Sequence, residues 1–212
     1  MTPLLLIGGG GHCHACIDVI ETAGGYAITG VIQPKSAGQA PVQGYPILGD
    51  DEALPDLLRR TSNALITVGQ INSPDTRVRL YHLLKTHGAE LPVIQSPTAY
   101  CSRHATVGEG SILLHGSLVN ANARIGANCI INTQALVEHD ARIGDHCHIA
   151  TGARVNGGAT VGTGSFIGSG AILREGITIG ECTVIGAGQV ILRDLPPHSR
   201  VPSAKLGTSA AE

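Results

Sequence analysis

Residues 107–112 read VGEGSI, and the pattern returns as IGANCI (125–130), IGDHCH (143–148), VGTGSF (161–166) and IGECTV (179–184). Between these segments the pattern is unbroken, because an aliphatic residue stands at every sixth position from Val107 to Ile191, fifteen positions in all. The residue two places before most of these anchors is Ser, Ala or Cys, and Gly often follows the anchor. Self-similarity at a fixed short period indicates a stacked repeat architecture.

The six-residue period predicts a three-sided parallel β-helix, in which three hexads form one coil. Side chains alternate along a strand, so an anchor and the small residue two places earlier both point inward, and anchors eighteen residues apart stack about 4.8 Å above one another. Glycine and asparagine tolerate the positive φ that tight corners need, and they stand at Gly110, Asn122, Asn128, Gly158, Gly164, Gly170 and Gly188. A content of 29 glycines and 2% aromatic residues suits this narrow core. We expect about five coils, beginning near Pro97.

The bulk composition excludes several classes of protein. A formal net charge of −2 leaves no basic surface for nucleic acid, and no apolar run approaches the ~20 residues that span a bilayer. The first residues carry no signal-peptide pattern. The six cysteines are expected to be free thiols, which favours a cytoplasmic protein. Without a spanning segment, no membrane partner is expected.

The first hundred residues alternate between strand and helix patterns. We expect strands at 4–7, 27–32 and 64–68, and helices at 12–23, 51–60 and 74–87. This order favours a small α/β domain with a parallel sheet, similar to a Rossmann domain.

A run of four glycines, Gly8 to Gly11, separates the first strand from the first helix. Free backbone N–H groups at such a turn bind anions, although a tight turn without a ligand is the alternative. The glycines are offset by one from G-x-G-x-x-G, and the second strand ends in Gln33 where a ribose-binding acid is expected. These two features exclude an NAD oxidoreductase and leave a nucleotide-linked sugar as the expected ligand.

Four segments carry a resemblance to a known family: IGGGGH (7–12), GYPILGDDE (44–52), INTQALVEHD (131–140) and PPHSRVPSAKL (196–206). With these segments the chain resembles the hexapeptide-repeat family of bacterial sialic acid O-acetyltransferases and nucleotide-linked 4-amino-sugar N-acetyltransferases of bacillosamine and perosamine synthesis. The resemblance implies a left-handed β-helix, a homotrimer that binds acetyl-CoA between adjacent columns, and a role in surface polysaccharide or glycan biosynthesis. It divides the chain into a sugar-nucleotide-binding domain (1–96), an acyltransferase β-helix (97–195) and a C-terminal tail (196–212).

The resemblance implies a general base at His139, with Asp140 fixing its tautomer. A neutral imidazole can accept a proton near pH 7, and a carboxylate stabilises the imidazolium that forms. His139 stands two places after the anchor Val137, so the winding puts it at an outward corner. A solvated turn histidine is the alternative for this residue.

The resemblance implies two further sets of site residues. The expected acetyl-CoA contacts are Asn132, His148, Gly157, Gly168 and Gly186; His148 could instead be a surface residue and Gly157 a corner glycine. The expected sugar-nucleotide contacts are Gly9, Gly10, Gly11, His12, Gln33, Lys35 and Gly69. The family has acidic residues where this chain has Gln33 and Lys35.

The function implied is direct attack of a sugar 4-amino group on acetyl-CoA, with no acyl-enzyme and no metal. O-acetylation of sialic acid is the nearest alternative. Because histidines occur at 115, 139, 146 and 148, a β-helical zinc carbonic anhydrase is an alternative from another class, and a non-catalytic scaffold is a third. Cys129 and Cys147 occupy small inward positions; Cys13 and Cys16, spaced C-x-x-C in the first helix, have no second pair for a metal site.

Overall fold

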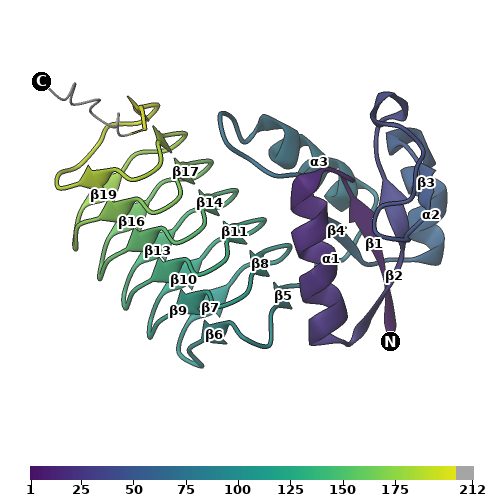
Figure 1. Ribbon diagram of the computed structural model, residues 1–212, viewed down its shortest axis with the longest axis horizontal. Coiled ribbons are helices and arrows are strands. Elements are labelled where there is room, and N and C mark those ends of the chain that lie inside the picture. The colour runs from purple at the N-terminus through teal and green to yellow at the C-terminus, as the bar shows by residue number, and fades with distance from the viewer. Residues whose placement is uncertain (204–212) are drawn as a thin grey trace, which may run out of the picture.

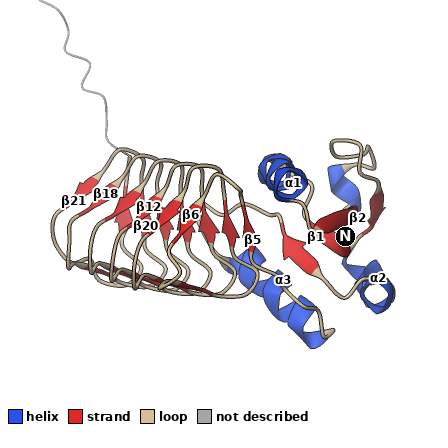
Figure 2. Ribbon diagram, turned by 90° about the horizontal axis from the view of Figure 1, so that it is seen from below, coloured by secondary structure: helices blue, strands red, loops and turns tan. Residues whose placement is uncertain are grey.

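The computed structural model describes residues 1–203, which form an N-terminal α/β domain beside a three-sided column, here called the prism (Figures 1 and 2). Each side of the prism is a stack of parallel two-residue strands. Pairing follows an eighteen-residue register, since Ile125 pairs with Val107 below it and with Ile143 above it. The repeat architecture and its left-handed winding are confirmed.

The prism has three faces, which are named here for their outward residues or for the domain beside them. The domain-facing face consists of β5 (Ile94–Gln95), β8 (Ile112–Leu113), β11 (Ile130–Ile131), β14 (His148–Ile149), β17 (Phe166–Ile167), β20 (Val184–Ile185) and β22 (Arg200–Val201). The apolar face consists of β6 (Tyr100–Cys101), β9 (Leu118–Val119), β12 (Leu136–Val137), β15 (Arg154–Val155), β18 (Ile172–Leu173) and β21 (Val190–Ile191). The arginine face consists of β7 (Thr106–Val107), β10 (Arg124–Ile125), β13 (Arg142–Ile143), β16 (Thr160–Val161) and β19 (Thr178–Ile179).

The interior of the prism is packed as the sequence pattern predicts. The anchors from Leu113 to Ile191 are all buried, and the Cys129 and Cys147 side chains are fully enclosed among them. All seven Gly and Asn residues assigned to corners have φ between 54° and 72°. Asp140 (φ 60°) and His146 (φ 57°) occupy equivalent corners without being glycine. A local six-residue rule therefore accounts for the whole column.

The prism is longer at both ends than the expected boundaries at 97 and 195. β5 pairs with β8, and β22 pairs with β20, so residues 94 and 201 still belong to the stack. The stack is longer because one additional strand pairs at each end, beyond the stretch with the aliphatic period. Residues 204–212 of the expected tail, with the last three residues of the segment 196–206, lie outside the described residues.

The N-terminal domain contains a parallel sheet of order β3-β2-β1-β4. Its elements are β1 (Thr2–Ile7), α1 (Gly11–Ala23), β2 (Tyr26–Ile32), the 3-10 turn η1 (Lys35–Ala37), β3 (Ile47–Gly49), the 3-10 turn η2 (Asp51–Ala53), α2 (Leu54–Arg60), β4 (Ala64–Ile66) and α3 (Asp75–Thr86). The edge strand β3 was not expected, because three residues are too few to show a period of two. The helix expected from residue 51 begins as η2 and becomes α-helical only at Leu54, where Pro55 suits the first turn.

Both sides of this sheet are covered. Alternate residues of β1 point to α1 on one side and toward α2 and α3 on the other. The outer surface of α1 also packs on Ile94, Ile112 and Ile130 of the domain-facing face (Figure 2). No helix among residues 1–203 has the length and apolar character needed to cross a membrane.

A buried arginine joins the two domains. The Arg77 side chain on α3 is 1% exposed. Its Nη1 donates to the carbonyl oxygens of Ile66 (3.0 Å) and Val68 (2.7 Å), and its Nη2 donates to the Asn128 carbonyl (3.0 Å) and Oδ1 (2.5 Å). Burial lowers the pKa of Arg77 to about 10, so the guanidinium remains charged. This cation fixes the loop after β4 against a corner of the prism.

Candidate active site

His139 lies in the turn between β12 and β13, at the edge where the apolar face meets the arginine face. Its side chain is 62% exposed, and the imidazole points out of the prism. The Nδ1 atom is 2.8 Å from Oδ2 of Asp140. An exposed imidazole bonded through Nδ1 presents Nε2 to a reactant.

Asp140 is positioned by the corner that it occupies. Its left-handed backbone turns the carboxylate back toward the imidazole, and Asn122, one coil earlier, donates from Nδ2 to Asp140 Oδ1 at 3.3 Å. The hydrogen bond to Asp140 raises the pKa of His139, and the same bond, with that from Asn122, lowers the pKa of Asp140. The pair is therefore a carboxylate that strengthens the basicity of its neighbouring imidazole.

Gly157 stacks on His139 one coil later. A Cβ atom at Gly157 would lie 2.8 Å from both Cε1 and Nε2 of the imidazole, which is closer than van der Waals contact allows. Among residues 1–203, its N–H group donates to no protein acceptor. The glycine thus leaves room for the imidazole and leaves an N–H group free beside it.

A second group of expected residues meets in a cleft between the N-terminal domain and the prism. The cleft has a volume of about 590 Å³ and is lined by Gly10, Gly11, His12, Ala15, Thr67, Val68, Gly69, Gln70, Ile71, Asn132 and His148. Residues expected on the nucleotide and residues expected on acetyl-CoA therefore share one cleft. Four lining residues that were not expected lie at the carboxyl end of the third predicted strand, which is a typical ligand-binding position in a parallel sheet: Thr67, Val68, Gln70 and Ile71.

His148 forms one wall of this cleft and is 7% exposed, so it is not a surface residue. Its Nδ1 donates to the Gln70 carbonyl at 2.6 Å, and its Nε2 accepts from Nδ2 of Asn132 at 3.0 Å. Burial lowers the pKa of His148 to about 4. The imidazole is thus neutral near pH 7, with a tautomer set by Gln70.

His12 stands at the start of α1, and its ring centroid is 6.3 Å from that of His148. Burial, and then the Arg77 charge, lower the pKa of His12 to about 3. Gly10, the residue before α1, has no side chain to cap the helix. The backbone N–H groups at this helix start therefore face the cleft beside a neutral histidine.

Gln33, Lys35 and Gly9 do not line this cleft. Gln33 is buried and donates from Nε2 to the Gly38 carbonyl at 3.1 Å, while Lys35 Nζ lies 3.1 Å from Asp50 Oδ2 at the end of β3. A Cβ atom at Gly9 would overlap Gln33 Oε1 at 2.1 Å, so this glycine allows the two loops to pack. The chain turns into η1 directly after β2, so Gln33 packs against Gly9 with its amide turned to Gly38, and Lys35 reaches Asp50 instead of the cleft.

Gly168 and Gly186 lie on the edge where the domain-facing and apolar faces meet, at the same turn position as Asn132. A Cβ atom at Gly168 would lie 2.6 Å from the backbone nitrogen of Ala187. Glycine at 168 thus allows the following turn to pack directly against this one.

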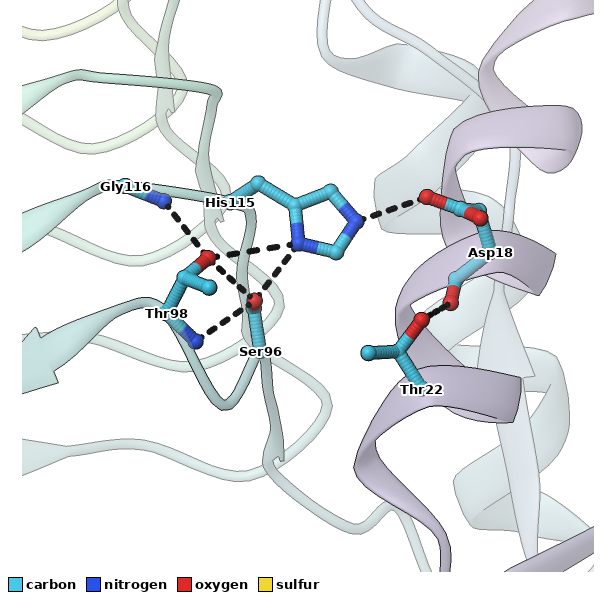
Figure 3. A network of polar contacts seen from close by, with 6 residues as sticks. All are labelled: Asp18, Thr22, Ser96, Thr98, His115 and Gly116. Atoms are coloured by element: carbon cyan, nitrogen blue, oxygen red, sulfur yellow. Dashed lines mark hydrogen bonds and ion pairs between the residues drawn. The ribbon is translucent and has the colours of Figure 1, made fainter.

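His115 and His146 take part in contacts between the two domains, the latter because its carbonyl accepts from Gln70 Nε2 at 3.0 Å. His115 Nδ1 lies 2.6 Å from Ser96 Oγ, and its Nε2 lies 2.7 Å from Asp18 Oδ2 on α1 (Figure 3). His146 Nδ1 is 3.0 Å from Nδ2 of Asn128. Within the described part of the chain, no three His, Cys, Asp or Glu side chains come together as a metal-binding group, and all six cysteines are free.

Two family descriptions match the chain. The PglD N-terminal domain matches residues 3–84, and the bacterial transferase hexapeptide (six repeats) matches residues 122–157. No protein with a curated description matches.

Solved structures match most of the chain. A histidine-to-alanine variant of GDP-perosamine N-acetyltransferase from Caulobacter crescentus, in complex with CoA and GDP-perosamine, is 34% identical, with a TM-score of 0.87 over 94% of this chain and 93% of that one. The chain belongs to the hexapeptide-repeat sugar acetyltransferases. PerB from the same organism, also with CoA and GDP-perosamine, is 35% identical with a TM-score of 0.85 over 93% of this chain and 92% of that one. The acetyltransferase domain of PglB from Neisseria gonorrhoeae, in complex with acetyl coenzyme A, is 30% identical with a TM-score of 0.88 over 96% and 98% of the two chains.

In this acetyltransferase the two groups of site residues lie on different edges of one prism. His139, Asp140 and Gly157 lie between the apolar and arginine faces, whereas Asn132 lies between the domain-facing and apolar faces. The full width of the apolar face separates the exposed His139 imidazole from the cleft beside the glycine turn.

Proposed function

We propose that this acetyltransferase transfers the acetyl group of acetyl-CoA to the 4-amino group of a nucleotide-linked deoxysugar. The observation that carries the proposal is the exposed His139–Asp140 pair, seated on Gly157 at an edge of the hexapeptide prism. This pair occurs in a chain 34–35% identical, over more than nine tenths of its length, to enzymes solved with CoA and GDP-perosamine.

The chemistry follows from the atoms at this edge. Nε2 of neutral His139 accepts a proton as the amine nitrogen attacks the thioester carbonyl, and Asp140 stabilises the imidazolium through Nδ1. The free N–H of Gly157 is placed to donate to the carbonyl oxygen as negative charge develops on it. The carbon–sulfur bond then breaks, and the imidazolium returns the proton to the CoA sulfur. No acyl-enzyme is needed.

The apolar face supports a homotrimer. Its outward residues are Tyr100, Leu118, Leu136, Arg154, Ile172 and Val190, and five of these six are aliphatic or aromatic. Tyr100 is 57% exposed and Val190 is 56% exposed in the single chain, and Leu192 nearby is 59% exposed. A largely apolar strip of this kind, interrupted at Arg154, is typical of a surface that another subunit covers.

A trimer would also unite the two groups of site residues. If the three apolar faces turn toward a common threefold axis, the His139 edge of one subunit lies against the Asn132 edge of the next. The groove between them would hold acetyl-CoA along Asn132, Gly168 and Gly186. The sugar nucleotide would reach the same groove from the cleft at Gly10, Gly11 and His12.

The free thiols favour a reducing compartment. All six cysteines are unpaired, and Cys13, Cys16, Cys129 and Cys147 are buried. Such cysteine usage is typical of the cytoplasm, which is where nucleotide-activated sugars for surface glycans would be modified.

The test is acetyl transfer from acetyl-CoA to a panel of GDP- and UDP-linked 4-amino sugars and to sialic acid, followed by release of free CoA thiol. We expect transfer to an amino sugar, and His139→Ala should lower kcat by roughly 10²–10⁴ while acetyl-CoA affinity and oligomeric state persist. Transfer to sialic acid alone would replace the amine acceptor with a hydroxyl. Unchanged turnover in His139→Ala would refute the assignment of the base.

A further inference from the structure

A polar cavity lies on the arginine face directly beside the His139 edge. It has a volume of about 500 Å³ and is lined by His104, Thr106, Asn122, Arg124, Asp140 and Arg142. These residues form two columns with an eighteen-residue spacing. His104, Asn122 and Asp140 stack in the turns, and Thr106, Arg124 and Arg142 stack on the strands. Asp140 belongs to both the cavity and the pair with His139, so the cavity opens next to the base.

The two arginines of this cavity repeat one position in successive coils. Arg124 pairs in register with Arg142 through β10 and β13, with Thr106 below and Thr160 above. Strands stack about 4.8 Å apart, so the two cationic side chains begin from neighbouring points on one face. Like charges in register on adjacent strands repel one another.

Within residues 1–203 neither guanidinium has an ion-pair partner, although the Arg142 charge contributes to lowering the pKa of Asp140. Among residues 1–203, Arg124 and Arg142 form no salt bridge, and their side chains make no hydrogen bond. Asp140 is the one carboxylate in the cavity lining, and its Oδ2 is held by His139 and its Oδ1 by Asn122. Two unpaired guanidinium groups in one concave site offer forked donors suited to phosphate oxygens.

We propose that Arg124 and Arg142 bind the diphosphate of the nucleotide-linked sugar and orient its amine toward His139. The inference rests on the proposed function and assigns it two specificity-determining residues. In a nucleotide-linked 4-amino sugar, the diphosphate on C1 and the amine on C4 lie on opposite sides of the pyranose ring. A cavity that starts at Asp140 and extends to the arginines fits this arrangement, since an amine at His139 places the diphosphate about one sugar ring away.

The direction of the cavity favours the acceptor over the donor. The glycines expected along the CoA chain, Gly168 and Gly186, lie in coils after His139. The cavity lies in coils up to and before His139, ending at His104. A phosphate bound there is thus on the far side of the base from the expected course of CoA.

The test is steady-state kinetics of Arg124→Gln, Arg142→Gln and the double variant, varying each substrate in turn. We expect KM for the nucleotide sugar to rise about tenfold to a hundredfold for each arginine, with KM for acetyl-CoA unchanged. Arg→Lys at the same positions should restore part of the loss, because the charge remains. Added salt should raise KM for the nucleotide sugar in the parent enzyme and have less effect in the double variant. Arg60→Gln, on exposed α2, is the matched control and should leave both KM values unchanged.

Titration calorimetry with GDP, UDP and inorganic pyrophosphate, on the parent enzyme and on the double variant, separates this inference from the proposed function. Loss of diphosphate affinity in the double variant supports the site even if the parent enzyme acetylates none of the amino sugars. A rise in KM for acetyl-CoA instead would assign the arginines to the phosphates of CoA and overturn the proposal. Unchanged KM and unchanged diphosphate affinity in a folded double variant would overturn it as well.

Discussion

Replacing Gly157 with alanine should disable the active site without unfolding it. The new Cβ atom would lie 2.8 Å from Cε1 and Nε2 of His139. Non-bonded carbon atoms prefer separations of about 3.5–4.0 Å, so the imidazole must move by about 1 Å. A displacement of about 1 Å at a reacting group costs on the order of 10² in rate, and we expect kcat to fall by about that factor.

The fold should tolerate this substitution. The φ of Gly157 lies outside the left-handed region, and the His139 side chain is 62% exposed and free to rotate away. We expect a change in the free energy of unfolding within about 0.5 kcal/mol, as for most surface substitutions. The N–H of residue 157 is retained in alanine, so the loss would report on the imidazole rather than on a missing donor.

The assay is CoA thiol release at saturating substrates, combined with urea unfolding monitored by circular dichroism. Gly158 provides a matched control, because a Cβ atom there meets nothing within 4 Å but the φ is +66°. Gly158→Ala should therefore lower stability by about 1 kcal/mol and spare kcat. In a His139→Ala background, Gly157→Ala should cause no additional loss of rate. An equal loss in both backgrounds would refute the steric reasoning.

Three further predictions concern charge. In the parent enzyme kcat/KM should rise with pH through the raised pKa of His139, above 6.5, and Asp140→Asn should move this acid limb to lower pH because it removes the group that raises the pKa. Arg77→Met should lower the free energy of unfolding by about 3–5 kcal/mol, measured by urea denaturation, because the Ile66, Val68 and Asn128 carbonyls lose their donor. Since the folded pKa values of His12 (about 3) and His148 (about 4) lie below 6.5, the unfolded chain binds protons first. Stability should therefore fall by about 1.4 kcal/mol per pH unit for each histidine between pH 6 and 4.

Each of these has its own control. Arg79→Met, two residues further along α3, breaks only an exposed ion pair to Asp51 and should cost at most about 1 kcal/mol; equal effects at Arg77 and Arg79 would contradict the interdomain role. His148→Gln should roughly halve the acid slope of stability, because His12 still contributes, and an unchanged slope would show that folding does not lower the pKa of His148. An acid limb that stays in place in Asp140→Asn would mean that another group controls it.

Much of the prism could be predicted from the chain because its rule is local. The period of six alone specified which side chains point inward, which corners need positive φ and that residue 139 lies on an outer edge. Periodicity was less informative in the N-terminal domain, where β3 has three residues and pairs only at one edge.

The surroundings of the site depended on contacts between residues far apart in the sequence. The neutral state of His148 comes from burial under the N-terminal domain, and its tautomer is set by the carbonyl of Gln70, 78 positions earlier. The absence of Gln33 and Lys35 from the cleft lining comes from their bonds to Gly38 and Asp50. Each six-residue step of the prism depends only on residues close in sequence, so the sequence by itself could specify the column and the exposed position of His139. The cleft exists only where two independently patterned domains pack together through Arg77, and for that reason only the tertiary structure decided which residues line it.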